Sequence, residues 1–150
     1  MMPKASVKRL VECKKDQLID LVLDIEKYPE FVPFCLGAHV YERNEEGNLT
    51  LIIADLTIGK GPFKDTYTSD VKFDQKDSSI KVTNIDGPLK HLKNHWKFND
   101  HESGAEIYFD IDFEIRNKFL NIAMTKSFEF GLNKIADAFQ KRANELFSKT

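Results

Sequence analysis

The segment from Ala105 to Ile115 alternates between apolar and polar side chains, and this pattern constrains the fold more than any other feature of the chain. Its apolar positions are Ala105, Ile107, Phe109, Ile111, Phe113 and Ile115, separated by Glu106, Tyr108, Asp110, Asp112 and Glu114. Successive side chains of a strand point to opposite faces of the sheet. The pattern therefore predicts a half-buried antiparallel strand with one apolar face and one mostly acidic face.

A period of two extends back along the chain, interrupted by short groups of turn-forming residues. We expect a first strand over residues 6–11 and further strands over residues 39–43, 49–58, 63–73, 79–85, 91–98 and 105–115. The gaps between the later strands have hairpin length, so these strands should form an antiparallel meander.

The last two strands carry opposite charges on their outer faces. Joined by a turn over residues 99–104, they can place Lys97 opposite Glu106 and Lys93 opposite Asp110. Such cross-strand pairs each contribute roughly 0.2–1 kcal/mol and would define the register of the hairpin.

A helical period appears on both sides of the strand region. Asp16 is expected to cap a first helix that ends at Tyr28-Pro29, because the residue before a proline is disfavoured in the α region. Residues 30–34 can then form at most one further turn. A long final helix is expected over residues 121–147, with an apolar stripe of Phe128, Leu132, Ile135, Phe139, Arg142 or Ala143, and Leu146.

Together these elements predict an α+β fold in which a curved antiparallel sheet of about seven strands wraps around the long C-terminal helix. Two short helices should follow the first strand. With 150 residues, the chain is expected to form one domain over residues 1–150. Its 12 phenylalanines must either fill the space between sheet and helix or line it as a pocket.

Charge and cysteine usage exclude several classes of function. The net charge is −2, so no broad positive field would attract DNA. Cys13 and Cys35 show neither a CxxC motif nor zinc-ligand spacing, which fits a reducing compartment. The sequence shows no leader pattern and no segment of membrane-spanning length. We therefore expect a cytoplasmic protein with, at most, peripheral contact with the inner membrane.

The polar residues form no convincing catalytic or metal-binding group. The acidic row of the last strand is spaced too widely for one metal ion, and His39, His91, His95 and His101 do not form a ligand set. We expect no enzyme activity, no catalytic residue and no metal. Asn94 shares the inward face with Trp96, as either a satisfied bulge residue or a polar contact for a ligand. Asp65, Tyr67 and Ser69 either point into the interior or mark where the sheet edge meets solvent, and the latter is favoured.

The connector after the first helix, YPEFVPFC at residues 28–35, is unusually apolar for a surface turn. One interpretation is a short buried linker. The other is a flap over the mouth of a ligand cavity, made stiff by Pro29 and Pro33.

Three stretches carry a resemblance to a known family: YPEFVPFC, GPLKHLKNHWKF at residues 87–98 and AFQKRANELF at residues 138–147. They resemble the coenzyme-Q-binding START-domain family, which is also labelled polyketide cyclase/lipid transport and whose bacterial members include a ribosome-association toxin. The similarity extends over about residues 6–148. The resemblance implies a helix-grip (START/Bet v 1-like) fold and places the connector across one end of the cavity, which favours the flap interpretation.

The resemblance further implies binding and transport or chaperoning of a hydrophobic small molecule, most readily a polyprenyl quinone such as ubiquinone, in support of respiration or quinone biosynthesis. No cofactor is required. The family pattern tends to have glycine two residues before the tryptophan, where this chain has Asn94, a side chain that would narrow the cavity or add a polar contact. The residues expected at the cavity or its mouth are Phe31, Val32, Phe34, Leu56, Ile58, Phe73, Asn94, Trp96, Phe109, Phe128, Leu132, Ile135 and Phe139.

Two alternative functions follow from the same resemblance. The first is a ribosome-association toxin that binds a ribosomal subunit and blocks subunit joining. A local basic side of the final helix would suit it, formed by Lys118, Lys126, Lys134, Lys141, Arg142 and Lys149. The second is a polyketide cyclase-like enzyme, which would require an acid or base inside the cavity.

Overall fold

The computed structural model describes residues 4–60, 63–87 and 89–147. In chain order its elements are β1 (Lys4–Val11), α1 (Lys15–Leu23), the 3-10 helix η1 (Ile25–Glu30), β2 (Cys35–Glu46), β3 (Leu49–Lys60), β4 (Phe63–Asp74), β5 (Ser79–Asp86), β6 (Leu89–His101), β7 (Gly104–Ile115) and α2 (Lys118–Phe147).

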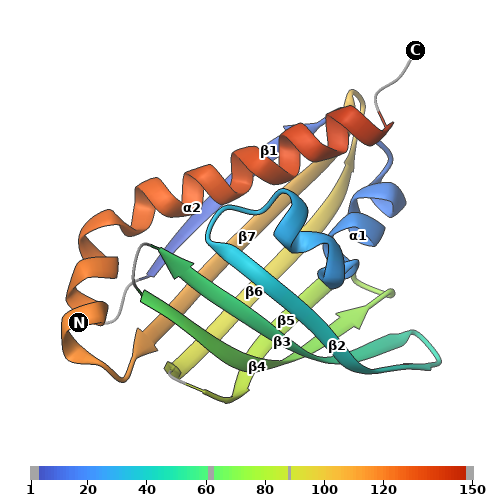
Figure 1. The fold of residues 1–150 in the computed structure, drawn as a ribbon. Helices are drawn as coiled ribbons and strands as arrows, with labels where there is room; N and C mark the ends of the chain where they lie inside the picture. Colours follow the sequence, from blue (N-terminus) through green and yellow to red (C-terminus); the bar gives the residue numbers. More distant parts are fainter. Residues whose placement is uncertain (1–3, 61–62, 88, 148–150) are drawn as a thin grey trace.

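The seven strands form one antiparallel sheet in the order β1-β7-β6-β5-β4-β3-β2. From β2 to β7 each strand pairs with the next in sequence, and β1 joins the free edge of β7. The sheet curves around α2, which lies across its concave side, while α1 and η1 cover one end (Figure 1). The expected meander and helix-grip arrangement are confirmed.

The first helix differs from the prediction. It ends at Leu23 instead of Tyr28, and the chain tightens into η1, which includes Pro29. The break lies at Asp24, whose backbone (φ −83°, ψ 66°) leaves the helical region. Asp16 is not the N-cap but lies in the first turn, since the helix begins at Lys15 and its N-cap is Lys14, two residues before the predicted one. At the N-terminus, the backbone N–H of Lys14 donates to Gln17 Oε1 at 3.0 Å.

The register of the β6–β7 hairpin also differs from the prediction. Both strands continue to a tight turn between His101 and Gly104, so Lys97 lies opposite Tyr108 and Lys93 opposite Asp112. The predicted partners, Glu106 for Lys97 and Asp110 for Lys93, are wrong by two residues. A shift of two leaves every side chain on its predicted face, so the alternation of apolar and polar residues could not reveal it.

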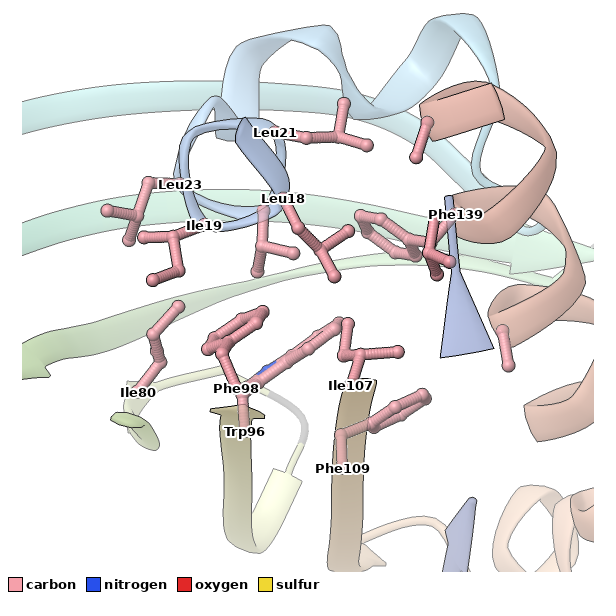
Figure 2. Packing of buried hydrophobic residues seen from close by; sticks show 14 of the residues in the cluster. Leu18, Ile19, Leu21, Leu23, Ile80, Trp96, Phe98, Ile107, Phe109 and Phe139 are labelled. Atoms are coloured by element: carbon pink, nitrogen blue, oxygen red, sulfur yellow. The ribbon is translucent and has the colours of Figure 1, made fainter. Parts of the chain in front are cut away.

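The core is densest where α1 and the C-terminal half of α2 meet the sheet (Figure 2). Trp96 is 6% exposed, as predicted, and its ring stacks on Phe109 with centroids 4.5 Å apart. Phe139 of α2 meets Trp96 edge-on at 5.4 Å. From above, Leu18 and Ile19 of α1 complete the same cluster.

The apolar stripe of α2 agrees with the prediction over residues 132–143. Leu132, Ala136, Phe139 and Ala143 are buried, at the three- and four-residue spacing of one helix face. Lys134 and Lys141 are exposed on the other side. Leu146 is 47% exposed and so does not belong to the stripe. The side chain of Phe128 lies outside the described residues.

Candidate functional site

Two adjacent rows of side chains on the concave face differ sharply in burial. The first, here called the closed row, is buried and consists of Ile80, Trp96 and Phe109, whereas the second, the open row, is half-buried and consists of Val82, Asn94 and Ile111. The two rows are neighbours in register. The closed row is covered because α1 packs over this end of the sheet. The open row keeps surface that a water molecule can reach.

Of the residues predicted to contact a ligand, Phe31, Val32 and Phe34 lie in the connector and the side chain of Phe128 lies outside the described residues. The others share this concave face or the facing side of α2, but they differ in burial. Trp96, Phe109, Leu132 and Phe139 belong to the closely packed core. By contrast, Leu56, Ile58, Phe73, Asn94 and Ile135 are half-buried. The second group therefore keeps side-chain surface that solvent can reach, whereas the first group is packed into the core.

Asn94 is fully engaged with its neighbours. Its side-chain amide donates from Nδ2 to the backbone carbonyl of Asp110 at 2.6 Å and accepts the indole N–H of Trp96 on Oδ1 at 2.7 Å. Its first task is therefore structural, since it satisfies the polar atom of a buried tryptophan. This arrangement is the satisfied alternative considered from the sequence.

The connector packs against the C-terminal half of α2. The Phe31 ring meets Tyr28 and Phe139 edge-on, with centroids 6.1 Å and 5.2 Å away. On its other side, the Arg142 guanidinium lies 5.2 Å from the Phe31 ring centroid and donates to Glu30 Oε1 at 2.8 Å. The connector thus joins the helix through one aromatic cluster and one ion pair.

Phe34 has an unusual backbone. Its φ of 69° lies in the left-handed region, which a bulky residue enters only at an energetic cost of about 1–2 kcal/mol. Two of its contacts help to hold it there. The Phe34 carbonyl accepts the Gly59 N–H at 2.9 Å, and the ring lies against Gly131 of α2, where a Cβ would be 3.7 Å from Phe34 Cε2. Such strain at a connector is characteristic of a functional segment.

On the outer surface, a shallow open groove of about 690 Å³ is lined by residues of both the connector and α2. Both charge signs occur along it, and its lining residues are Pro29, Glu30, Phe31, Val32, Pro33, Lys134, Asp137, Ala138, Lys141, Arg142 and Glu145. With its mixed charge, the groove lacks the single-sign field expected of a strong anion site.

Three weakly acidic groups lie close together at the connector: Tyr28 and Cys35, which belong to it, and Tyr67 of β4. Burial raises the pKa of the Tyr28 and Tyr67 hydroxyls far above the ordinary tyrosine range, and each is raised further by the other groups nearby, Cys35 among them. Burial likewise raises the pKa of the Cys35 thiol. All three therefore stay neutral and can act only as hydrogen-bonding groups near neutral pH.

The inward polar residues of β4 correct a prediction. Ser69 is buried and donates to the Ala54 carbonyl at 3.2 Å, while Tyr67 is half-buried and packs against the small cluster of Leu92 and Phe113. Only Asp65 is exposed. The favoured interpretation, a sheet edge in solvent, thus fails for Ser69 and Tyr67, because the curvature of the sheet encloses this part of β4.

The acidic row of β7 lies on the outer face beside basic residues of β6. His91 Nε2 lies 3.6 Å from Asp112 Oδ1, and His95 Nδ1 lies 4.0 Å from Asp110 Oδ2. Among the described residues, no three His, Cys, Asp or Glu side chains gather as a metal site would require. Both cysteines are free and buried. No described helix is long and apolar enough to span a membrane.

Comparison with known proteins places these features in context. The chain is 31% identical to the ribosome association toxin RatA of Rickettsia prowazekii over 141 residues, which cover 92% of this chain and 94% of the toxin. It is 32% identical to RatA of Escherichia coli K12 over 149 residues, covering 99% and 91%. A mitochondrial coenzyme Q-binding protein, COQ10 of Dictyostelium discoideum, is 28% identical over 138 residues, covering 90% and 66%.

Solved structures share the fold over nearly the whole chain. An 18 kDa protein of Caulobacter crescentus has a TM-score of 0.80 at 26% identity, covering 97% of this chain and 98% of that one. A START superfamily protein of Mycobacterium smegmatis has a TM-score of 0.78 at 17% identity, covering 97% and 98%. A Streptomyces aromatase/cyclase has a TM-score of 0.77 at 14% identity, covering 96% and 94%, and shares the fold alone.

One family model describes most of these elements together. It matches residues 11–140, from the end of β1 through the closed and open rows to the part of α2 that carries Phe139. The chain therefore belongs to the family of polyketide cyclases/dehydrases and lipid-transport proteins.

Proposed function

We propose that the protein binds and carries a hydrophobic small molecule of the polyprenyl quinone type on the concave face of its sheet, without a cofactor and without performing chemistry on it. The observation that carries this proposal is the change from the closed row to the open row. Half-buried apolar side chains on the inner face of a sheet provide surface that a ligand can remove from water.

The energetics favour an apolar tail at this position. Burial of apolar surface contributes roughly 25 cal/mol per Å² removed from water, so an isoprenoid tail gains affinity in proportion to its covered length. The half-buried residues Leu56, Ile58, Val82 and Ile111 offer such surface. Their support is rigid, since the closed row beside them is tightly packed.

Two observations support a quinone as the ligand. A relative at 28% identity is named as a coenzyme Q-binding protein, and the family description includes lipid transport. A quinone combines a long apolar tail with a small polar head. The neutral hydroxyl and thiol groups at the connector suit such a head better than they suit a charged one.

The connector would act as the flap over this site. Phe31 and Phe34 reach α2 from outside the sheet, and the strain at Phe34 keeps the closed arrangement only as long as its contacts persist. Ligand transfer would take place at a membrane surface, where a quinone resides.

The test is lipid extraction of protein purified from its own host, combined with native mass spectrometry and transfer of ubiquinone between liposomes. We expect quinone to co-purify with the folded protein and to move faster between vesicles when the protein is added. Protein that carries no quinone and leaves the transfer rate unchanged would overturn the proposal.

Association with a ribosomal subunit is the second candidate. It is favoured by one observation: two relatives named as ribosome association toxins match this chain over at least 92% of its length. The basic surface expected on α2 is smaller than predicted, because the Arg142 guanidinium is paired with Glu30 and lies over the Phe31 ring. Lys134 and Lys141 remain exposed beside the groove, while the side chains of Lys126 and Lys149 lie outside the described residues.

Co-sedimentation with purified ribosomal subunits tests this candidate. If α2 contacts ribosomal RNA, the charge reversals Lys134→Glu and Lys141→Glu should weaken binding, and added salt should weaken it further. The matched control is Lys76→Glu, at an exposed position in the turn after β4. Binding that ignores both the α2 variants and the salt concentration would exclude this surface.

A further inference from the structure

Tyr67 extends from the concave face of β4 toward the small cluster of Leu92 and Phe113, which the open-row residues Val82 and Ile111 also contact. Its backbone position is restricted by Gly87, because a Cβ on that glycine would lie 2.8 Å from both Tyr67 Cα and Tyr67 Cβ. The backbone at Gly87 therefore passes close to that of Tyr67, whose ring lies beside the open row.

The hydroxyl of Tyr67 differs in its hydrogen bonding from the two other weakly acidic groups at the connector, those of Tyr28 and Cys35. The Tyr28 hydroxyl donates to the Val22 carbonyl, and Cys35 Sγ donates to the Gly37 carbonyl at 3.5 Å. No hydrogen bond of the Tyr67 hydroxyl is found within the described part of the chain. Among the described residues, the polar side-chain atoms that are fully buried without a partner do not include this hydroxyl, so it remains accessible and is available to a ligand.

Its surroundings define what that ligand must offer. Burial, with Cys35 as the nearby acidic group, raises the pKa of the Tyr67 phenol far above its ordinary value, so it stays protonated and donates. Among the described residues, the one titratable group that shifts the pKa of this phenol is the neutral thiol of Cys35. A neutral acceptor, such as a carbonyl oxygen, fits this environment, whereas a carboxylate or phosphate would lose its hydration without a compensating cation.

We propose that the Tyr67 hydroxyl donates a hydrogen bond to a carbonyl oxygen in the head of the bound ligand, which places the head beneath the connector and the apolar tail along the open row. This inference rests on the proposed function and deepens it. It selects a neutral carbonyl-bearing head, such as a quinone, over a charged lipid headgroup. Asn94, whose amide is held by Asp110 and Trp96, then lines the site, and Tyr67 recognises the polar head of the ligand.

The variant Tyr67→Phe removes one oxygen and keeps the ring. Binding of ubiquinone-2, followed by quenching of Trp96 fluorescence, should weaken about five- to tenfold, as expected for one lost hydrogen bond to a neutral acceptor. Binding of an oxygen-free terpene hydrocarbon of similar tail length should not change. The matched control is Tyr108→Phe, on the outer face of β7, which should affect neither ligand.

The outcomes separate this inference from the proposed function. Equal affinity of Tyr67→Phe and wild-type protein for ubiquinone-2, or equal loss for both ligands, would overturn the role of Tyr67 and leave quinone binding standing. A wild-type protein that binds neither ligand would overturn both. Thiol labelling of the unmutated protein provides a second measurement. Ubiquinone-2 should protect Cys35 and leave the labelling of Cys13 unchanged, and equal labelling of Cys35 with and without ubiquinone-2 would contradict a head beneath the connector.

Discussion

The amide oxygen of Asn94 lies 2.7 Å from the indole nitrogen of Trp96, two residues further along the same strand. The same amide donates to the carbonyl of Asp110 on the neighbouring strand, so one side chain links two strands and a buried ring. A glycine at this position would leave the indole N–H without this acceptor. Asn94 therefore supports the closed row while forming part of the open row.

Replacing Asn94 with alanine should destabilise the protein. The substitution leaves the Trp96 N–H and the Asp110 carbonyl without their partner, and a buried unsatisfied polar group costs about 1–3 kcal/mol. Urea denaturation followed by circular dichroism measures the change. Asn99→Ala, at an exposed position on the same strand, should remain within about 0.5 kcal/mol of wild type. Similar stability of both variants would contradict the role assigned to Asn94.

Two phenylalanines of α2 provide a matched pair for the core. Phe139 is 3% exposed and contacts Trp96, Tyr28 and Phe31, whereas Phe119 is 85% exposed. Truncation of Phe139 to alanine should cost about 3–5 kcal/mol, because it removes buried surface and leaves a cavity. Phe119→Ala should change the free energy of unfolding by less than about 0.5 kcal/mol. Equal losses in thermal denaturation would show that α2 does not pack as described.

Sequence reasoning succeeded where one property of each residue decides its place. The alternation in β6 and β7 correctly placed Trp96 and Phe109 on the concave face, and the helical period placed Leu132 and Phe139 against them. Burial of apolar surface drives these choices, and it depends on which side chains are apolar rather than on which atoms they meet.

Prediction from the sequence failed where the position of a side chain depends on which residues it contacts in the fold. Nothing in the alternation of β1 indicates that the Arg9 guanidinium reaches α2, where it donates to Asn133 Oδ1 at 2.9 Å and Asp137 Oδ1 at 3.2 Å. Edge strand β1 lies close enough to the helix for a long side chain to bridge the gap. Likewise, Tyr67 looked like a residue of a solvated edge because the alternation does not reveal how strongly a sheet curves.

Stability should fall in alkaline solution because of the buried tyrosines. Burial raises the pKa of Tyr28 and Tyr67, so both keep their protons in the folded protein above pH ~10, where the unfolded chain releases them. The unfolded state then binds fewer protons, and the free energy of unfolding decreases as pH rises, by up to ~1.4 kcal/mol per pH unit for each tyrosine. Cys13 and Cys35, whose pKa values are also raised by burial, act in the same direction from a somewhat lower pH.

Urea titrations between pH ~8 and ~11 measure this dependence. Tyr67→Phe removes one of the groups, so its free energy of unfolding should decline less steeply with pH than that of the wild type. An unchanged slope would indicate that Tyr67 ionises in the folded protein and is therefore not enclosed as described.

The connector offers the sharpest test of how the site opens. If Phe31 and Phe34 cover a bound quinone, replacing both with serine should affect ligand retention more than folding. Both side chains are only half-buried, so their loss should cost less than the ~3–5 kcal/mol expected for a fully buried phenylalanine such as Phe139. Serine at position 34 also removes the ring contact with Gly131 that helps to hold the left-handed backbone.

Ligand retention during gel filtration and the thermal midpoint, measured on the same preparation, distinguish the two interpretations of this segment. A flap predicts a modest decrease in the midpoint together with rapid loss of bound ubiquinone, since water enters where the rings stood. Suppose instead that the double variant is destabilised as strongly as Trp96→Ala while its folded fraction keeps the ligand. Residues 28–35 would then be a buried linker, and the entrance would have to lie elsewhere along the rim of the sheet, with the turn that follows β5 as the next segment to substitute.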